Sequence, residues 1–187
     1  MGMPQTMERW TAERVRALPD DGKRYEVVAG ELLVTPAPSF DHQEAVLALA
    51  VRLRAYVAGS GLGRLAVSPA DIEFDFETLV QPDVFVVPLV DGKRPRRWSE
   101  ISALVLAVEV LSPSTAHADR TVKRALFQRV GVPEYWIVDV DARLVERWRP
   151  DDRRPEILSD VLLWQPDAAQ APLTIDLGDY FREVLDA

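Results

Sequence analysis

The feature that most restricts the fold of this chain is an apolar run with a single acid inside it. Residues 104–111 read LVLAVEVL, so every position except Glu109 is apolar. A run so rich in valine and leucine, ended by Ser112-Pro113-Ser114, predicts a strand that is buried on both faces. An ionised carboxylate inside such a strand is costly unless a cation meets it. The sequence therefore predicts a cationic partner for Glu109.

Length and composition limit the class of protein. The chain has 187 residues, of which 48% are hydrophobic and 28% charged, which is typical of a soluble globular domain with a full core. No apolar run reaches the roughly 18 residues of a membrane span, and the N-terminus lacks the pattern of a secretory signal. There is no cysteine. This excludes disulfides, thiolate catalysis and Cys-ligated zinc, and it fits a cytoplasmic protein.

The charge of the chain bears on its partners. The formal net charge is −8, which argues against a general nucleic-acid-coating surface but leaves room for a local basic groove. A basic loop over residues 89–103 contains the candidates for nucleic-acid binding, which are Lys93, Arg94, Arg96 and Arg97. Trp98 in the same loop could stack on a base. A solvated loop with a half-buried tryptophan is the simpler interpretation, and we favour it.

The order of predicted elements indicates an α/β protein with a mixed sheet flanked by helices. A first helix is capped by Thr6 and runs to about Ala17, and a hairpin follows with its turn at Ala29-Gly30. Ser39 caps a long helix to about Ala58. Strands are expected at 65–67, 71–77, 81–87, 104–111, 134–140 and 144–148, with a helix after 111 and short strands and a final helix near 180–185 in the remainder.

A second lone acid, Asp83, stands at the start of the predicted strand over 81–87. Strands joined by a crossing loop are often sheet neighbours, which would bring Asp83 and Glu109 together. Adjacent carboxylates repel each other unless a cation lies between them. A hard divalent ion suits such oxygen ligands. Two salt-bridged structural acids are the alternative, and the spacing leaves both interpretations open.

The helix that follows Glu109 supplies a lysine on its apolar side. Asp119, Lys123 and Phe127 recur at helical spacing, so Lys123 is expected to point inward. A lysine ammonium is a compact charge that suits the positioning or activation of a water molecule. The alternative is a structural pair between Asp119 and Lys123, worth about 0.3–0.5 kcal/mol.

Taken together, Pro82-Asp83, Glu109-Val110-Leu111 and Lys123 resemble the PD-(D/E)XK nuclease superfamily. Leu111 stands where that superfamily usually has its lysine, and Lys123 stands where some variants carry it on the next helix. More closely, the chain resembles the Uma family of restriction-endonuclease-like bacterial proteins over about residues 24–150. The matching stretches are Tyr25–Leu32, Pro36-Ala37-Pro38 with His42-Gln43, Gln81-Pro82-Asp83, Val108–Ser114, Asp119 with Lys123, and Glu134–Asp139.

The resemblance implies a fold, a cofactor and a set of residues. It implies a single restriction-endonuclease-like domain over 1–187, in which Asp83, Glu109 and the carbonyl of Val110 hold Mg²⁺ or Mn²⁺. The ion would lower the pKa of a bound water, and Lys123 would orient that water or stabilise the transition state. Candidates for indirect support or substrate contact are Glu26, His42, Gln81 and Asp119. Glu26 is preferred over Glu31 because both cannot easily face one site.

The implied function is hydrolysis of DNA phosphodiester bonds. Restriction-like nucleases often act as dimers, so a homodimer or higher homo-oligomer is expected by analogy, with the apolar strands around Trp164 as an exposed interface. Two alternatives remain open. One is an inactive nuclease fold that only binds a partner, and the other is a metal phosphodiesterase that acts on small substrates. The Phe127 position usually carries tyrosine in the family, so a hydroxyl role there is absent from this chain.

Overall fold

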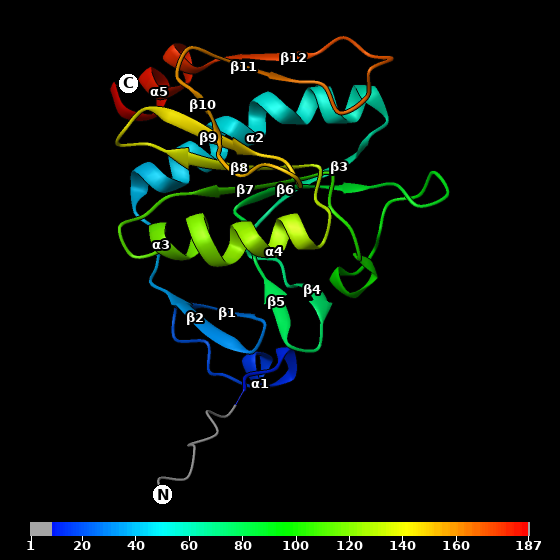
Figure 1. The fold of residues 1–187 in the computed structure, drawn as a ribbon, viewed down its shortest axis with the longest axis vertical. Coiled ribbons are helices and arrows are strands. Elements are labelled where there is room, and N and C mark those ends of the chain that lie inside the picture. The colour runs from blue at the N-terminus through cyan, green and yellow to red at the C-terminus, as the bar shows by residue number, and fades with distance from the viewer. Residues whose placement is uncertain (1–8, 187) are drawn as a thin grey trace, which may run out of the picture.

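A six-stranded mixed sheet forms the centre of the protein in the computed structural model, which describes residues 9–186 (Figure 1). Its strand order is β10-β9-β8-β7-β6-β3. The strands are β3 (Gly63–Val67), β6 (Val84–Pro88), β7 (Leu106–Val110), β8 (Glu134–Asp139), β9 (Leu144–Trp148) and β10 (Glu156–Leu158). Only the β7–β8 pair is parallel, so the predicted mixed sheet is confirmed.

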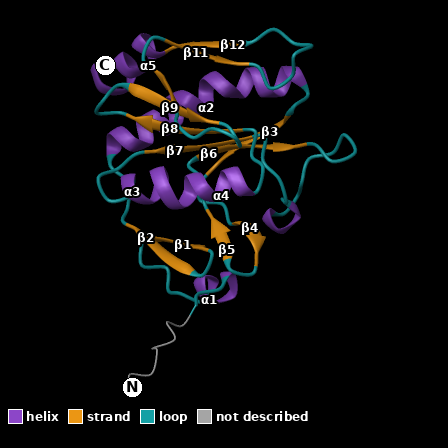
Figure 2. Cartoon of the chain, viewed as in Figure 1, coloured by secondary structure: helices purple, strands orange, loops and turns teal. Residues whose placement is uncertain are grey.

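One face of this sheet is covered by a long helix and the C-terminal elements. Helix α2 (Phe40–Ser60) begins after Ser39, whose hydroxyl accepts a hydrogen bond from the backbone N–H of His42, as expected for an N-cap. Beside α2 lie the hairpin of β11 (Val161–Trp164) and β12 (Leu173–Asp176) and the last helix, α5 (Leu177–Asp186) (Figure 2).

The apolar residues Val161 and Leu163 beside Trp164 are 43% and 50% exposed, so an interface over these strands stays a prediction, but Trp164 itself takes no part in it. The side chain of Trp164 is fully buried, because the C-terminal hairpin folds back over the sheet and α2. The indole packs edge-on against Trp136, with ring centroids 5.7 Å apart, and against Tyr56 at 5.6 Å. Burying three large aromatic surfaces together stabilises this face.

A broken helix covers the other face of the six-stranded sheet. It consists of α3 (Ala116–Ala118), a π-helical turn η2 (Asp119–Lys123) and α4 (Arg124–Arg129), and it forms the crossover between parallel strands β7 and β8. Phe127 packs on Tyr135 with ring centroids 4.8 Å apart, which anchors the helix to β8. Short π-helical turns shift side chains relative to a regular helix and are frequent at functional sites.

A second, four-stranded sheet lies below this helix in Figure 1, in the order β2-β1-β5-β4. Its hairpin joins β1 (Arg24–Val28) to β2 (Glu31–Thr35) through Ala29 and Gly30, which both have positive φ, as a type I′ turn requires. The helix α1 (Ala12–Arg16) closes this end of the molecule. Thr11 caps it, whereas the predicted cap, Thr6, lies outside the described residues.

The predicted strand over 71–77 is shorter in the structure, as β4 (Ile72–Asp75), and β5 (Thr78–Val80), which was not predicted, follows it. The carboxylate of Asp75 accepts a hydrogen bond from the backbone N–H of Glu77 at 2.9 Å. Aspartate side chains often stabilise turns in this way. The chain therefore reverses at Phe76-Glu77 instead of continuing as one strand.

Candidate active site

The register of β6 and β7 brings the two lone acids together. Val84 lies opposite Val108 in this antiparallel pair, so Asp83, one residue earlier, stands across from Glu109, one residue later. Directly opposed residues share a face of the sheet and have neighbouring Cβ atoms. The Oδ2 atom of Asp83 also accepts a hydrogen bond from the backbone N–H of Val110 at 2.9 Å. Both acids are almost completely buried, at 3% and 1% exposure.

Lys123, on η2, points into the same region and is 1% exposed. Its ammonium donates a hydrogen bond to Oε1 of Glu109 at 3.0 Å. The same Nζ lies 2.8 Å from Oε2 of Glu26 on β1 and 3.5 Å from Oδ1 of Asp119 on its own helix. The i, i+4 pair with Asp119 is the longest of the three contacts, so that pair alone does not account for the position of Lys123.

Electrostatics fix the protonation of Lys123. Burial by itself lowers the pKa of this lysine, but the charges of Glu109, Glu26 and Asp119 outweigh it and hold the pKa well above its usual range. The side chain therefore stays an ammonium at neutral pH. It can stabilise negative charge and orient a water molecule, but it does not accept a proton.

Asp83 has two further partners. The Nη1 atom of Arg24 lies 2.6 Å from Oδ1, and the Nε2 atom of His42 lies 3.2 Å from Oδ2. Burial raises the pKa of Asp83, yet the His42 hydrogen bond, the Arg24 charge and the Val110 N–H together hold it below its ordinary value. Asp83 is therefore ionised.

Arg24 was not predicted from the sequence. It precedes Glu26 by two residues on β1, so both side chains leave the strand on the same side. This i, i+2 relation could have identified Arg24 from the sequence, but only once Glu26 was known to face the site. By contrast, Glu31 on the other hairpin strand is exposed.

Gln81 joins the hairpin to Asp83. Its backbone N–H donates to Oε1 of Glu26 at 2.7 Å, and its side-chain amide donates to Asp71 at 2.9 Å. Its carbonyl accepts a hydrogen bond from Arg24 at 3.1 Å. Gln81 therefore holds Glu26 and Arg24 in place rather than facing the carboxylates itself.

The site holds more negative than positive charge. Four buried carboxylates meet there, on Glu26, Asp83, Glu109 and Asp119. Within residues 9–186, the permanent cations in contact with them are Lys123 and Arg24. Burial and the charges of the other three acids raise the pKa of Glu109 well above its usual range, against the opposing effect of Lys123. A divalent cation would remove this imbalance.

The donors present fit a magnesium or manganese ion. Asp83, Glu109 and the neighbouring Val110 carbonyl are hard oxygen ligands, and Mg²⁺ commonly takes one or two carboxylates and completes its shell with water and substrate. In the part of the chain that the structure describes, no three His, Cys, Asp or Glu side chains form a metal-holding group by themselves. A metal ion bound here would therefore need backbone, water and substrate oxygens in addition to the two carboxylates.

Two cavities open onto the site. The larger, about 980 Å³, is lined by Arg24, His42 and Asp83 among others, and the smaller, about 130 Å³, is lined by Glu26, Asp119 and Lys123. Thr35, Ser114 and Thr115 line both. Asp83 thus faces the large groove, where a substrate would lie, and Lys123 faces the small pocket behind it.

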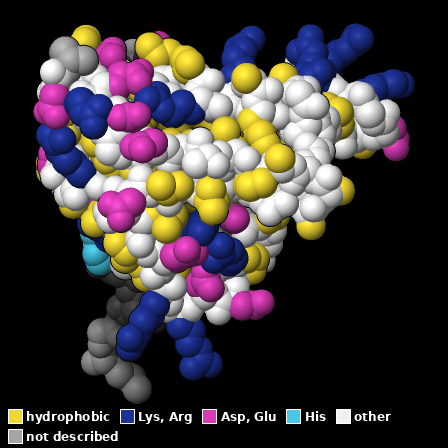
Figure 3. Space-filling model, turned by 90° about the horizontal axis from the view of Figure 1, so that it is seen from above, with side chains coloured by type: hydrophobic (Ala, Val, Ile, Leu, Met, Phe, Trp, Pro, Cys, Tyr) yellow, Lys and Arg dark blue, Asp and Glu magenta, His cyan; other side chains and the backbone are white. Residues whose placement is uncertain are grey.

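The basic loop lies at the other end of the strands. It joins the end of β6 to the start of β7, whereas Asp83 and Glu109 lie at the opposite ends, about 17 Å away for a strand of five residues. Lys93, Arg94, Arg96 and Arg97 are exposed, and Figure 3 shows basic side chains projecting from that end of the molecule. Trp98 is half exposed and rests on Phe85 at 6.1 Å. The loop therefore does not line the candidate site.

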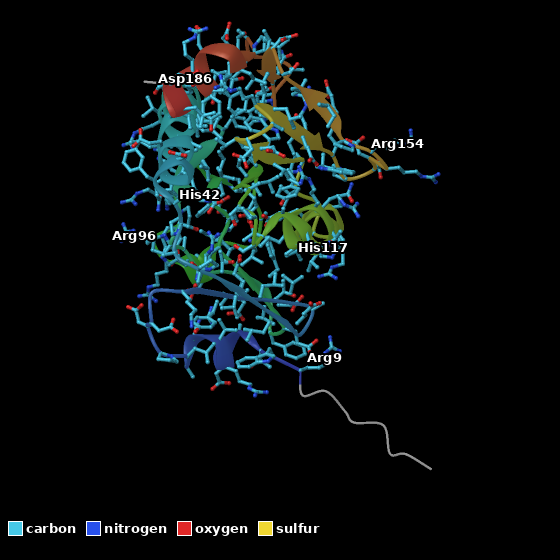
Figure 4. All side chains as sticks on the ribbon, turned by 90° about the vertical axis from the view of Figure 1, so that its left-hand side faces the viewer. Arg9, His42, Arg96, His117, Arg154 and Asp186 are labelled. Carbon is cyan, nitrogen blue, oxygen red and sulfur yellow. The ribbon has the colours of Figure 1, made fainter. Side chains whose placement is uncertain are left out.

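Figure 4 shows the remaining histidine, His117, at the surface of α3, away from His42. Its side chain is exposed. His42 instead lies on the inward side of α2, against Asp83.

A mixed sheet with paired acids on adjacent strands, and a lysine beside them from the crossover helix, defines a restriction-endonuclease-like α/β protein. The fold is similar to the crystal structure of a "putative nuclease belonging to DUF820" from Anabaena variabilis, with a TM-score of 0.77. The two chains are 18% identical, and the match covers 94% of this chain and 99% of that one.

The sequence profile of the Uma2 family, described as "Putative restriction endonuclease", matches residues 12–178. The chain therefore belongs to the Uma2 family, and the family resemblance predicted from its motifs is confirmed. No curated protein matches the chain. Among residues 9–186, no helix is both long and apolar enough to cross a membrane.

Proposed function

We propose that this protein is a metal-dependent endonuclease that hydrolyses DNA phosphodiester bonds at the site around Glu109. The observation that carries the proposal is the buried ammonium of Lys123, 3.0 Å from Glu109, in a site with surplus negative charge. In this proposal, Asp83, Glu109 and the Val110 carbonyl hold Mg²⁺ or Mn²⁺. The bound ion would polarise a phosphate oxygen and lower the pKa of a water molecule.

Lys123 is assigned an electrostatic role. Because its pKa is held well above the usual range, it remains charged and stabilises the negative charge that develops on the phosphate. Glu26 and Asp119 act as positioning residues, since both ion pairs hold the ammonium against Glu109. The pairing also offsets the cost of burying the lysine.

Arg24 and His42 stand at the side of Asp83 that lines the large groove. Arg24 occupies Oδ1 of Asp83 at 2.6 Å, so this contact must break before that oxygen can bind a cation. Once released, the guanidinium remains next to the groove and can pair with a substrate phosphate.

The test is a nicking assay on supercoiled plasmid DNA with Mg²⁺ or Mn²⁺. We expect cleavage to fall by about 10²–10³-fold in Lys123→Gln, because one stabilising charge is lost, and to be abolished in Asp83→Asn and Glu109→Gln. Lys93→Gln is the matched control, because Lys93 is an exposed lysine at the far end of the strands. Equal cleavage by all four variants would rule out this site.

A second candidate function is hydrolysis of small phosphodiesters. The lining of the large groove favours it, because this lining holds five aspartates against Lys23, Arg24 and Arg120, and a surplus of negative charge repels a long polyanion. An assay with bis(p-nitrophenyl) phosphate beside plasmid DNA separates the two candidates. Metal-dependent turnover of the small diester, without nicking of DNA, would favour the second.

A further inference from the structure

Helix α2 carries large apolar residues on both of its sides. Its inner side packs into the core through residues such as Leu49, Leu53 and Val57. Its outer side carries Phe40, Leu47 and Val51, which are 77%, 58% and 64% exposed. A surface helix normally has a polar outer side, and a helix that is apolar all round is normally covered on all sides. The outer side of α2 therefore lacks a cover among the described residues.

The exposed residues follow a regular spacing. The outer stripe runs through Phe40, Glu44, Leu47, Val51, Arg54 and Ala58, at alternating steps of four and three residues. This is the spacing of a helix that packs against another helix along its length. The stripe is about 27 Å long, at 1.5 Å per residue. Figure 4 shows α2 along one edge of the molecule, opposite the side marked by Arg154.

The stripe is complementary to itself when two copies run antiparallel. A two-fold axis beside Leu49 places Leu47 opposite Val51 of a second copy and the large Phe40 opposite the small Ala58. It also places Glu44 opposite Arg54. Each contact then occurs twice, as in every two-fold interface.

The charges support the same arrangement. Within residues 9–186, neither Glu44 nor Arg54 has an ion-pair partner. By contrast, the neighbouring Arg52 is paired with Glu183 on α5 at 2.6 Å. The two unpaired charges thus lie at symmetric positions on the apolar stripe, and each would meet its opposite in the second copy.

We propose that the outer side of α2 forms a two-fold dimer interface with a second copy of this chain, with the axis midway between Leu47 and Val51, at the level of Leu49 along the helix. The interface does not depend on the proposed nuclease activity. It does set the distance between the two candidate sites, since His42 of each copy lies seven residues from the axis. The two histidines are then about 21 Å apart along the helices.

The first test is the oligomeric state, measured by sedimentation equilibrium of the full chain. We expect the wild-type protein to be a dimer at micromolar concentration and Leu47→Glu to be a monomer. Leu163→Glu is the matched control, because Leu163 on β11 is similarly exposed, at 50%, but lies outside the stripe. A monomeric wild-type protein, a dimer that Leu47→Glu leaves intact, or a dimer that Leu163→Glu dissociates would overturn the proposal.

The second test checks the register. Glu44→Arg and Arg54→Glu each replace two attractive pairs by two repulsive ones, so each should weaken the dimer by about tenfold. An equimolar mixture of the two variants should recover the wild-type affinity, because each arginine pair then faces a glutamate pair. The double variant should recover it as well. All three proteins should keep the wild-type circular dichroism spectrum, since both positions are outside the core. A mixture no tighter than the single variants would overturn the register.

Discussion

The surroundings of Lys123 favour a lysine over an arginine at this position. Its ammonium is shared by three carboxylates that come from three elements, at 2.8, 3.0 and 3.5 Å. A compact charge can meet three acids from one point, whereas the planar guanidinium of arginine requires more room and a fixed fork of donors. The restricted space between the two sheets therefore favours lysine.

Glu109 is expected to give the protein an unusual dependence of stability on pH. Its pKa is raised in the folded protein, chiefly by burial, so the folded state binds this proton more tightly than the unfolded state does. Without metal, the free energy of unfolding should therefore increase as the pH falls through the raised pKa, and the gain should be complete below the ordinary value of 4.5.

The Glu109→Gln variant tests this dependence. It keeps an oxygen that can accept from Lys123 but removes the charge, so it should be more stable than the wild-type protein at neutral pH and less sensitive to pH. Urea unfolding at a series of pH values measures both effects. If the free energy of unfolding of Glu109→Gln changed with pH as steeply as that of the wild-type protein, Glu109 would not be the group responsible. The contribution of Asp83 to stability has the opposite pH dependence. Because its pKa is lowered in the folded protein, this contribution is complete above the ordinary value of 3.8 and is lost as the pH falls below it.

Arg24 is expected to compete with a metal ion for Asp83. Arg24→Gln removes the cation at Oδ1, 2.6 Å away, and leaves the carboxylate without its charge partner. The metal-free variant should lose about 1–3 kcal/mol of stability, but Mn²⁺ should raise its melting temperature more than that of the wild-type protein. Differential scanning calorimetry measures this directly. Arg97→Gln, in the remote loop, is the control. If Mn²⁺ raised the melting temperature of Arg24→Gln by no more than that of the wild-type protein, Arg24 would not compete with the metal.

At the scale of elements, the candidate site depends on how closely β3 approaches β6. Gly63 on β3 lies opposite Pro88, and a methyl group at Gly63 would collide with the carbonyl of Val87. The backbones are in contact there, so only glycine fits. Because Asp83 directly precedes β6, displacement of β3 would disturb the strand that follows this acid.

Two glycine-to-alanine variants separate this close approach from a general effect of glycine. Gly63→Ala should destabilise the protein by more than about 2 kcal/mol, since backbone atoms must move. Gly59→Ala, in the last turns of α2 with nothing within 4 Å of the added carbon, should instead stabilise it, by up to about 1 kcal/mol. Urea unfolding gives both values, and similar losses in the two variants would argue against the packing explanation.

For the whole molecule, the C-terminal elements belong to the main core. Leu162, Trp164, Ile175 and Tyr180 are buried with α2 and the six-stranded sheet. The Tyr180 hydroxyl also donates a hydrogen bond to the carbonyl of Ala45 at 2.9 Å. β10 therefore forms one edge of the sheet, and residues 161–186 cover one of its faces instead of forming a loose addition.

This packing predicts that Trp164 is important for the stability of the entire fold. Trp164→Ala should cost about 3–5 kcal/mol, because it leaves a large cavity between the C-terminal hairpin and the sheet. Leu163→Ala, the exposed neighbour on β11, should change stability by no more than about 0.5 kcal/mol. Chemical denaturation followed by fluorescence measures both, and a small effect of Trp164→Ala would mean that the hairpin unfolds separately.

The sequence by itself determined the parts of the protein that depend on local patterns. The β1–β2 hairpin follows from Ala29-Gly30, the start of α2 follows from Ser39, and the buried β7 follows from its apolar run. The two lone acids were also predictable as neighbours, because each interrupts an apolar strand and the two strands are successive in the sheet.

Only the tertiary structure decided what surrounds those acids. Glu26 and Arg24 reach the site from a separate sheet, His42 reaches it from α2, and Lys123 reaches it through a π-helical turn. The burial of Trp164 and the exposure of the outer side of α2 were equally hidden. Periodicity shows that a residue has an apolar neighbourhood, but which distant element supplies that neighbourhood depends on how the layers pack.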